Sequence, residues 1–490
     1  MATASRVSII RGEKRRRHRS SGAVVAPLYA TAALMAALHL AAWQSPELLQ
    51  LTFSMLPTAL VGLYILITRE RDPLSPPFVL LALCFFGVNL RTFSLIMDES
   101  AHIEHMLLPG VGIDALPTGV VAISVGLLAW FAGYSIPLRN RTLSSWGSRK
   151  RQWSWSRFKL VVAALLLIGL VSLFFYAREM NLGEAILSGR ISMKRRLEVE
   201  GSEFQATHGY LIWGAKFFDV AYFLALGLAF TFREKIRPKA LLVILALFGL
   251  ATIVPFVASA RTVIFNMLLL TMMMRHYLRQ RVRSRQVAVF ALLALALLAV
   301  LANLRETSNA REELSVSASG YLEDLQYTLN RPYFMGVAKT ALIVESVPER
   351  IDFLYGESFL LWILAPIPRV LWPAKPGVRI GRYVATEIYR RENQSGVPPG
   401  IIAEFYLNFG WFGIVAGLLL LGMLVQAFYR ALVLVPEPTP HGVLLYSIVA
   451  LALTLTAMAS DFTGTISSLG QYLVPLGLAH WFVTRPRPVS

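Results

Sequence analysis

The sequence predicts an all-α polytopic membrane protein, and this prediction comes from its composition and from the repetition of its apolar runs. Hydrophobic residues make up 56% of the 490 residues and charged residues only 16%, which differs from ordinary soluble domains. Runs of the roughly 20 apolar residues that cross a bilayer as a helix recur along the whole chain. We therefore expect one membrane domain with about twelve transmembrane helices.

The apolar runs define the candidate spans one by one. The first follows a basic tail and is longer than the apolar core of a typical signal peptide, so we expect an uncleaved span there. The twelve expected spans are 24–43, 49–68, 76–97, 115–136, 158–177, 210–232, 239–257, 262–278, 287–304, 411–433, 442–460 and 466–484.

These spans divide the chain into five parts with different expected roles. Loops as long as the two outer ones are often functional. The parts are a basic cytoplasmic tail (1–22), nine transmembrane helices with a periplasmic loop at about 178–209 (23–304), a large periplasmic loop with a broken interfacial segment (305–410), three further transmembrane helices (411–484) and a cytoplasmic tail (485–490).

The basic residues indicate the orientation of the chain. The net charge is +18, which by itself also suits nucleic acid. With the N-terminus in the cytoplasm, more than half of the 47 Lys and Arg residues fall in short cytoplasmic segments, as the positive-inside rule expects. The excess is therefore a topology signal that also suits anionic lipid headgroups. We expect both termini in the cytoplasm and no nucleic-acid partner.

The stretch from Gly356 to Gly377 predicts a site at the membrane surface. It is apolar enough to enter a bilayer but too short to cross one. Broken backbone at membrane depth survives only where protein buries it or water reaches it. Four prolines forbid a continuous helix, because each lacks an N–H donor and clashes with the preceding turn: Pro366, Pro368, Pro373 and Pro376.

Arg369 and Lys375 lie inside this broken segment and are the strongest candidates for binding an anion. The planar fork of arginine suits phosphate oxygens, and lysine adds a point charge. Arg379 and Arg382 extend the patch. The simpler alternative is an interfacial segment whose basic side chains reach up to lipid headgroups.

Other basic residues are further candidates for binding the phosphates or a glycan. Arg91 lies inside an apolar span without a local partner, and charges there are functional candidates by default. Arg261, in a short outer turn, is either an interface anchor or a cavity cation. Arg305 ends a span on the same side, where pairing with a nearby glutamate is the simpler role. Arg190 begins an Arg-x10-Gly pattern ending at Gly201, which chance readily produces.

A general base on the outer side has to be a carboxylate or a histidine. Glu404 leads, because it begins the last outer turn before the span at 411–433, and its alternative role is to hold arginines in place. No spacing singles out one residue from the others, which are Glu357, Asp352, His208 and Asp461.

Several common catalytic motifs are absent from the sequence. It contains no phosphate-binding P-loop, no dinucleotide fingerprint, no His/Glu zinc motif, no Gly-x-Ser-x-Gly elbow and no Asp-x-Asp metal motif. We therefore expect no cofactor and no metal.

Three sequence blocks resemble one enzyme family. Gly356-Glu357-Ser358, followed by Pro368-Arg369 and Trp372-Pro373-Ala374-Lys375-Pro376, resembles the oligosaccharide repeat unit polymerases, the O-antigen polymerase (Wzy-type) group. Glu404 to Gly410 is similar to the family's next block, and Ala258 to Arg261 to its small-Ser-x-Arg turn.

This resemblance implies a GT-C-like glycosyltransferase of the bacterial inner membrane with its active site facing the periplasm. A growing glycan would move from undecaprenyl pyrophosphate onto a lipid-linked repeat unit, with a chain-length regulator protein as a partner. Arg369 and Lys375 would stabilise the leaving pyrophosphate, assisted by Arg261 or Arg305, and Glu404 would deprotonate the sugar hydroxyl. The remaining candidates would contact the pyrophosphate or glycan: Arg379, Arg382, Arg91, Glu357, Asn408 and Arg190.

Two other classes of protein stay open as alternatives. An O-antigen ligase, or a related lipid-carrier glycosyltransferase, shares the expected topology and the large outer loop. A lipid-linked oligosaccharide transporter should show internal repeats and more intramembrane charge, and the sequence shows neither clearly.

Overall fold

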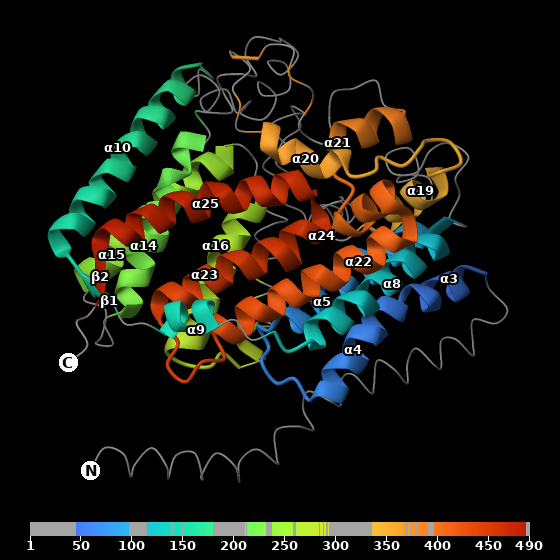
Figure 1. The fold of residues 1–490 in the computed structure, drawn as a ribbon, viewed down its shortest axis with the longest axis horizontal. Coiled ribbons are helices and arrows are strands. Elements are labelled where there is room, and N and C mark those ends of the chain that lie inside the picture. The colour runs from blue at the N-terminus through green and yellow to red at the C-terminus, as the bar shows by residue number, and fades with distance from the viewer. Residues whose placement is uncertain are drawn as a thin grey trace, which may run out of the picture.

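The computed structural model (Figure 1) shows a bundle of helices. The residues that it describes are 46–97, 115–138, 141–148, 151–179, 211, 213–231, 238–257, 261–283, 285–287, 289–290, 293, 336–365, 367, 371–372, 375, 377, 380–390 and 396–486.

The centre of the bundle is the packing of α8 (Leu116–Ser135) along α22 (Ile401–Leu432). Glycines let the two backbones approach closely. A Cβ at Gly133 would lie 2.0 Å from the Leu419 carbonyl oxygen, and one at Gly422 would lie 2.1 Å from that of Trp130. Since no side chain fits in either place, this crossing depends on glycine at both positions.

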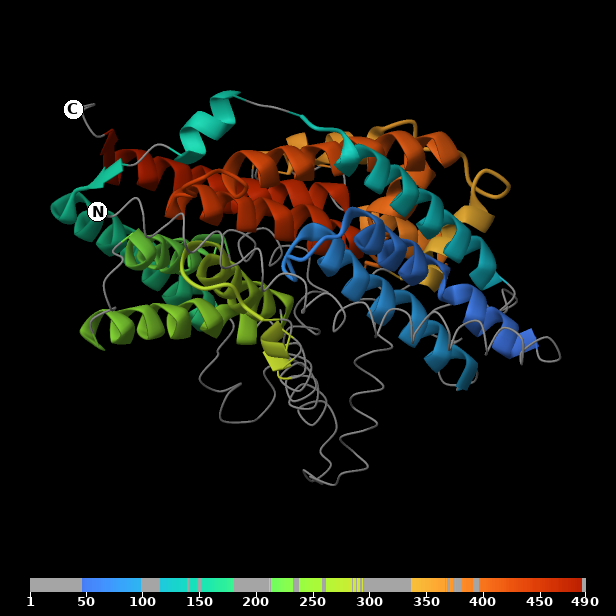
Figure 2. The same ribbon diagram turned by 90° about the horizontal axis from the view of Figure 1, so that it is seen from below.

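The other helices lie beside this pair in groups (Figures 1 and 2). The blue group on one side is α3 (Pro46–Ser54), α4 (Leu56–Thr68), α5 (Pro76–Cys84), the π-helical η2 (Phe85–Asn89) and α6 (Leu90–Met97). The green group on the other side is α10 (Trp155–Glu179), α14 (Phe217–Thr231), α15 (Pro238–Val257) and α16 (Arg261–Leu278).

The last helices of the chain lie between these groups, and short helices lie over one end of α22. The former are α23 (Pro440–Ala450), the π-helical η5 (Leu451–Thr456), α24 (Ala457–Ala459) and α25 (Phe462–Val483). The latter are α19 (Val337–Ser346), α20 (Glu357–Leu364), α21 (Ile380–Tyr383) and the π-helical η4 (Val384–Ile388).

Seven helices of the described chain are long and apolar enough to cross a membrane, which gives the protein a helical, multi-pass membrane architecture. They are Leu49–Thr68, Pro76–Phe93, Leu116–Ser135, Trp155–Arg178, Trp213–Thr231, Ile401–Leu432 and Pro440–Ala459. Each overlaps an expected span. Helices also form at the expected spans 239–257 and 262–278, but their apolar stretches are shorter than those of the seven. α25 is as long as the seven helices but less apolar. The expected span 24–43 and most of 287–304 lie outside the described residues.

Two local features were not expected from the sequence. A short helix, α9 (Arg141–Ser148), follows the third of these spans, and two antiparallel strands pair β1 (Arg151–Trp153) with β2 (Thr484–Pro486). Strands of three residues are too short to leave a period-two hydrophobic pattern in the sequence. Their pairing joins segments more than 300 residues apart.

The beginning of α22 also differs from the expected span at 411. Helix starts at Ile401, and the break lies inside it, at Phe409 and Gly410, where Gly410 has φ +61°. The carbonyl oxygens released by the break accept hydrogen bonds from elsewhere: Leu354 N donates to Leu407 O (3.0 Å) and Tyr355 N to Asn408 O (3.2 Å). The residues expected to form an outer turn are therefore a helical turn tied to a loop.

Candidate anion-binding site

Glu404 joins three parts of the structure at the start of α22. Its side chain is 0% exposed. Oε1 accepts a hydrogen bond from the Ser358 hydroxyl of α20 (2.8 Å), and Oε2 accepts one from the Phe462 backbone N–H at the start of α25 (2.6 Å). Because a buried carboxylate is costly unless it is hydrogen-bonded, these two donors are what allow the carboxylate to lie there.

Asn408 lies one helical turn after Glu404 and completes this network. Its Oδ1 accepts from Gly356 N (2.9 Å), and its Nδ2 donates to the Ser358 hydroxyl (2.8 Å) and to the Glu404 carbonyl oxygen (2.8 Å). Residues four apart share a helix face, so the first turns of α22 present both side chains to α20. The loop before α20 and the break in α22 are therefore fixed to each other.

Lys339 lies beside this network, on α19, and its side chain is only 3% exposed. Its Nζ donates to the carbonyl oxygens of Pro398 (2.9 Å) and Ala459 (3.0 Å). Burial, and then the charge of Arg91, lower the pKa of Lys339 to about 7, while Asp461 acts in the opposite direction. Lys339, Arg91 and Asp461 are therefore near neighbours.

Arg91 is the second buried cation, with a side chain 5% exposed. Its Nη1 is buried and has no hydrogen-bond partner among the described residues. It interacts electrostatically with Tyr389, beyond the end of η4. Native structures contain few buried donors without a partner, and each one calls for an explanation.

Asp461 is 4% exposed and caps α25 by accepting a hydrogen bond from Gly464 N. It lies close enough to Glu404 for the two carboxylates to interact electrostatically. We call the six side chains assembled here the Lys339 cluster. They are Arg91, Lys339, Ser358, Glu404, Asn408 and Asp461.

Gly400 allows the chain to pass close to Lys339. It has φ +82°, and a Cβ there would lie 2.7 Å from the Met458 carbonyl oxygen. Its N–H donates to Ser460 O (2.6 Å). The junction of α24 with α22, which supplies both carbonyl acceptors of Lys339, therefore requires glycine at this position.

The three π-helical segments of the described chain all lead into this region. Arg91 follows η2, Tyr389 follows η4, and Ala459, which accepts a hydrogen bond from Lys339, follows η5. Well under 1% of residues in globular proteins are π-helical, and such segments are frequent at functional sites because they redirect the side chains that follow.

The chemistry of the cluster suits an anion. Lys339 interacts electrostatically with Arg91 and with Asp461, while Nη1 of Arg91 has no acceptor among the described residues. Charge-assisted hydrogen bonds from arginine to phosphate or carboxylate are strong and geometrically specific. Within the described residues, no three His, Cys, Asp or Glu side chains are grouped so as to hold a metal ion.

The structure assembles part of the predicted site. Arg91, Glu404 and Asn408 lie in the Lys339 cluster. Lys375 is buried, and its Nζ donates to the carbonyl oxygens of Ala365 (3.1 Å) and Ile367 (2.8 Å), so it holds the broken segment together. α20 does end at Leu364, before the first proline, as the sequence predicts.

Other predicted residues lie away from the cluster or are not described. Glu357 and Arg382 are exposed. Arg261 begins α16, but its side chain lies outside the described residues. The same holds for the whole of four others, namely Arg369, Arg379, Arg305 and Arg190.

Two members of the cluster were not among the candidates chosen from the sequence. Ser358 lies in the motif that carries the family resemblance, but the resemblance implies no role for its side chain. Lys339 interrupts the apolar run Val337–Val344, and this was the available signal. A charge inside an apolar helix that is to be buried is a functional candidate by default, as for Arg91.

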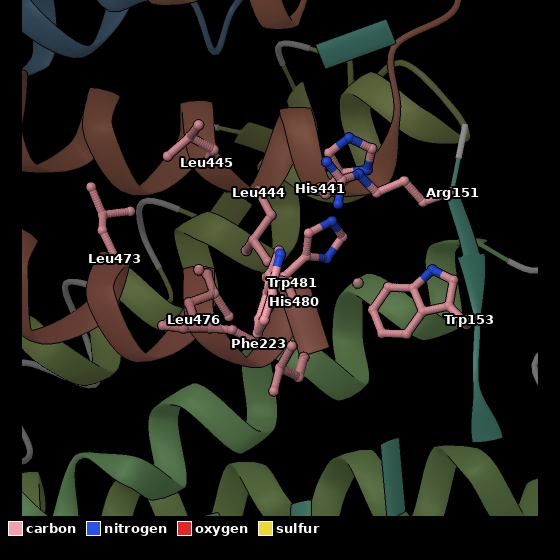
Figure 3. Close-up of a pocket in the computed structure, with 13 residues that line it drawn as sticks. Arg151, Trp153, Phe223, His441, Leu444, Leu445, Leu473, Leu476, His480 and Trp481 are labelled. Atoms are coloured by element: carbon pink, nitrogen blue, oxygen red, sulfur yellow. The ribbon is translucent and has the colours of Figure 1, made fainter. Parts of the chain in front are cut away.

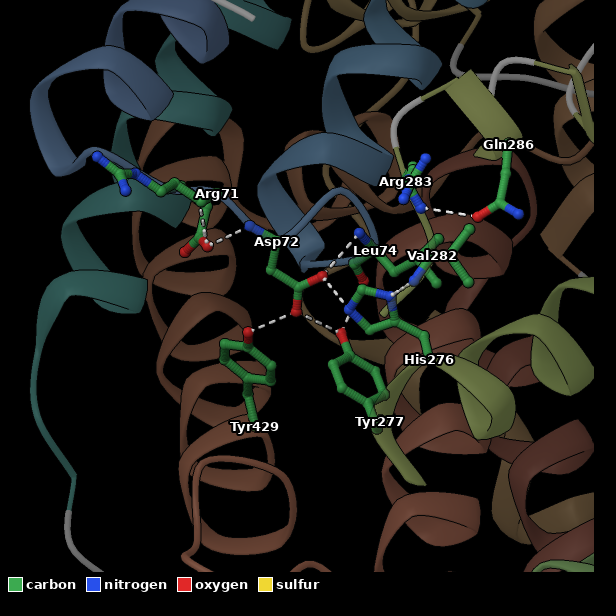
Figure 4. A network of polar contacts seen from close by, with 10 residues as sticks. Arg71, Asp72, Leu74, His276, Tyr277, Val282, Arg283, Gln286 and Tyr429 are labelled. Atoms are coloured by element: carbon green, nitrogen blue, oxygen red, sulfur yellow. Dashed lines mark hydrogen bonds and ion pairs between the residues drawn. The ribbon is translucent and has the colours of Figure 1, made fainter. Parts of the chain in front are cut away.

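A second polar network lies at the other end of α22 (Figure 4). Asp72 Oδ2 accepts hydrogen bonds from the hydroxyls of Tyr277 and Tyr429 (2.8 Å each). Asp72 Oδ1 accepts from Leu74 N (3.0 Å) and lies 3.0 Å from His276 Nε2. Since Val282 N donates to His276 Nδ1 (2.9 Å), the histidine proton is on Nε2. We call these residues the Asp72 cluster.

The Asp72 cluster has an electrostatic consequence for stability. Burial acts to raise the pKa of Asp72, but the hydrogen bonds from His276, Leu74 and Tyr429 outweigh it and lower this pKa. The group therefore contributes stability that is present above the ordinary carboxyl pKa and is lost as pH falls through the lowered value.

Comparison with known proteins gives one partial match. Residues 204–431 match the model of a family described as a domain of unknown function (DUF8712), which is less than half of the chain. No curated protein and no solved structure matches. Lys339, Ser358, Glu404 and Asn408 lie within the matched stretch, and Arg91 and Asp461 lie outside it. The match leaves function to be inferred from the site.

Proposed function

We propose that the protein is a polysaccharide polymerase of the bacterial inner membrane, with about twelve spans and a GT-C-like architecture. It transfers a growing glycan from undecaprenyl pyrophosphate onto a lipid-linked repeat unit at the periplasmic face. The observation that carries this proposal is the buried Nη1 of Arg91, without a partner among the described residues, next to buried Lys339. The family resemblance of the Gly356–Pro376 segment supports the same activity.

The chemistry needs cations more than it needs a cofactor. The bond between the sugar C1 and the pyrophosphate oxygen breaks, and a bond from C1 to the acceptor hydroxyl oxygen forms. The hydroxyl proton passes to a base, and negative charge develops on the leaving pyrophosphate. Preorganised donors in a site that excludes water stabilise such charge strongly. Arg91 and Lys339 supply them here, and Arg369 from the broken segment adds a third cation.

Other polar side chains hold the elements around the cluster together. Glu404 and Asn408 fix α20 to α22, and Lys375, outside the cluster, ties together the backbone at Ala365 and Ile367. Because both oxygens of Glu404 accept hydrogen bonds from the protein, its contacts in the free enzyme favour the positioning role over that of the base. To act as the base, the Glu404 carboxylate would have to lose one of these two hydrogen bonds and accept one from the sugar hydroxyl instead.

The test is the surface polysaccharide ladder of a strain that lacks this gene, complemented with the wild type, Arg91→Met or Arg430→Met. Arg430 is exposed near the end of α22, so Arg430→Met is the matched control. We expect glycan capped with a single repeat unit in the deletion strain and with Arg91→Met, and full ladders with the wild type and the control.

Other patterns would favour the alternatives. Polymer that accumulates on its lipid carrier without reaching its final acceptor would identify a ligase. Repeat units held on the cytoplasmic face would identify a transporter. A full ladder from Arg91→Met would remove Arg91 from the site whichever activity is present.

A further inference from the structure

A cavity of about 310 Å³ lies between α14, α23 and α25, at the end of α25 that is remote from Asp461 (Figure 3). Its volume is at the lower end of the roughly 300–1,000 Å³ of small-molecule sites. α25 has 22 residues, and each residue adds about 1.5 Å to a helix, so the cavity and the Lys339 cluster lie at opposite ends of the bundle. The cavity is therefore separate from the Lys339 cluster, on which the proposed function depends.

One part of the cavity wall is apolar and the other part carries nitrogen-bearing side chains. Leucines from three helices form the apolar part. Arg151 and Trp153 reach into it from β1, and His441 and His480 come from α23 and α25. The two imidazole rings lie 4.9 Å apart between centroids, and Trp153 packs edge-on against His480 at 5.8 Å.

Arg151 is the cation of this site. Figure 3 shows its side chain directed toward His441. Its Nη1 makes a long hydrogen bond of 3.4 Å to Thr484 Oγ1, and its Nε is buried without a hydrogen-bond partner among the described residues. The pairing of β1 with β2 holds the backbone of Arg151 opposite Pro486. A preorganised arginine with donors to spare is suited to a phosphate.

The surroundings favour a lipid over a soluble anion. Trp481 lines the cavity and is 72% exposed, and Leu478 and Val474 on the same helix are also exposed. Tryptophan is enriched at the boundary between a membrane and water. Arg157 and Lys159 lie in the first turn of α10, directly after β1, in a segment whose positive charge is expected to face the anionic leaflet.

We propose that this cavity binds one anionic phospholipid, with its phosphate at Arg151 and part of an acyl chain against the leucines of α23 and α25. Gly477 lines the cavity, and it leaves room for that chain because nothing lies within 4 Å of the position that its Cβ would take. The occupied site would hold the paired strands to the ends of α14 and α23.

The test uses the full-length protein in phosphatidylcholine nanodiscs, titrated with phosphatidylglycerol or with inorganic phosphate and followed by native mass spectrometry and thermal melting. Arg151→Gln removes the cation. Gly477→Leu fills the cavity and leaves Arg151 in place, and leucine is a better helix former than glycine. Gly470→Leu is the matched control, since Gly470 also lies on α25 with open space at its Cβ and does not line the cavity.

We expect phosphatidylglycerol to bind the wild type and Gly470→Leu about tenfold more tightly than the other two variants. Arg151→Gln loses a charge-assisted hydrogen bond to the phosphate, and Gly477→Leu occupies the space of the acyl chain. Equal binding to all four proteins would mean a nonspecific lipid shell and would overturn the proposal. Inorganic phosphate that stabilises the protein as well as the lipid does, with no effect of Gly477→Leu, would make the site one for a soluble anion.

Discussion

A carboxylate lies at each end of α22, half-buried Asp72 at one end and buried Glu404 at the other, and the two have different surroundings. At one end, Asp72 accepts hydrogen bonds from two tyrosines and a backbone N–H and pairs with His276. At the other end, Glu404 is also hydrogen-bonded, but the same cluster holds two buried cations, and one of them, Arg91, keeps a donor that nothing in the described chain accepts.

We interpret this difference as the one between a structural cluster and the proposed functional site. The donors around Asp72 come from a loop, α16 and α22, so the cluster ties three parts of the bundle together, and its geometry is complete. A buried cation with an unused donor costs stability. The Lys339 cluster keeps such a cation, which is the pattern of a functional site that sacrifices stability. Substitutions in the two clusters and the pH dependence of stability test this contrast.

Arg91→Met should abolish most of the activity and leave the fold as stable as the wild type or more so. Loss of one preorganised donor from the proposed reaction centre should lower the rate by about 10²–10³-fold. Methionine is uncharged, so the variant no longer bears the free-energy cost of burying the arginine charge. Glycan transfer by purified protein and its thermal melting measure the two effects. A melting temperature that falls together with the activity would show that Arg91 has a structural role, and the two clusters would then not differ in this respect.

Asp72→Asn should show the opposite pattern. One of the groups that donate to Asp72 would face the new amide N–H₂, so we expect a loss of about 1–3 kcal/mol of stability. Transfer activity per folded molecule should be unchanged. Tyr429→Phe is the milder companion, because it removes one of the hydrogen bonds to Asp72. Reduced activity of Asp72→Asn at normal stability would show that the two ends of α22 are functionally coupled.

The stability of the wild type should contain a component from Lys339 that rises with pH. Its pKa is about 7 in the folded protein and about 10.4 for an ordinary lysine. The unfolded chain therefore binds more protons between these values, and stability increases across that window. Thermal melts from pH 7 to 10 should show a steeper rise for the wild type than for Lys339→Met.

The matched control for this comparison is Lys159→Met, because Lys159 is exposed on α10 and its removal should leave the slope unchanged. A bound phosphate would favour the charged form of Lys339 and move the window to higher pH. Identical slopes for the wild type and Lys339→Met would contradict the buried, uncompensated state of this lysine.

Ser358→Ala should produce the smallest effect. The serine hydroxyl donates to Glu404 and accepts from Asn408, so its loss should cost about 1 kcal/mol of stability. Activity should fall only a few-fold, since Phe462 N still donates to Glu404. Denaturant unfolding and the transfer assay measure both. A loss of activity as large as that of Arg91→Met would place Ser358 in contact with substrate.

The membrane architecture follows from the composition and spacing of the apolar runs. Apolar runs of bilayer length can be satisfied only as helices that bond their own backbone, so the seven long apolar helices were foreseeable. Proline chemistry likewise predicted the end of α20 before Pro366. The sequence also marked Arg91, because a lone charge in an apolar run has no local explanation.

The packing of the helices determines which charged side chains become neighbours. Lys339 and Arg91 are separated by nearly 250 residues and become neighbours because the first turns of α19 and α6 lie in the same region of the bundle. Lys375 looks like a surface cation in the sequence, yet its ammonium turns inward to the carbonyl oxygens of Ala365 and Ile367. The partner of each charged side chain depends on which carbonyl and carboxylate oxygens the packing of the helices brings close to it. These oxygens often come from segments distant in the sequence, so local spacing does not predict them.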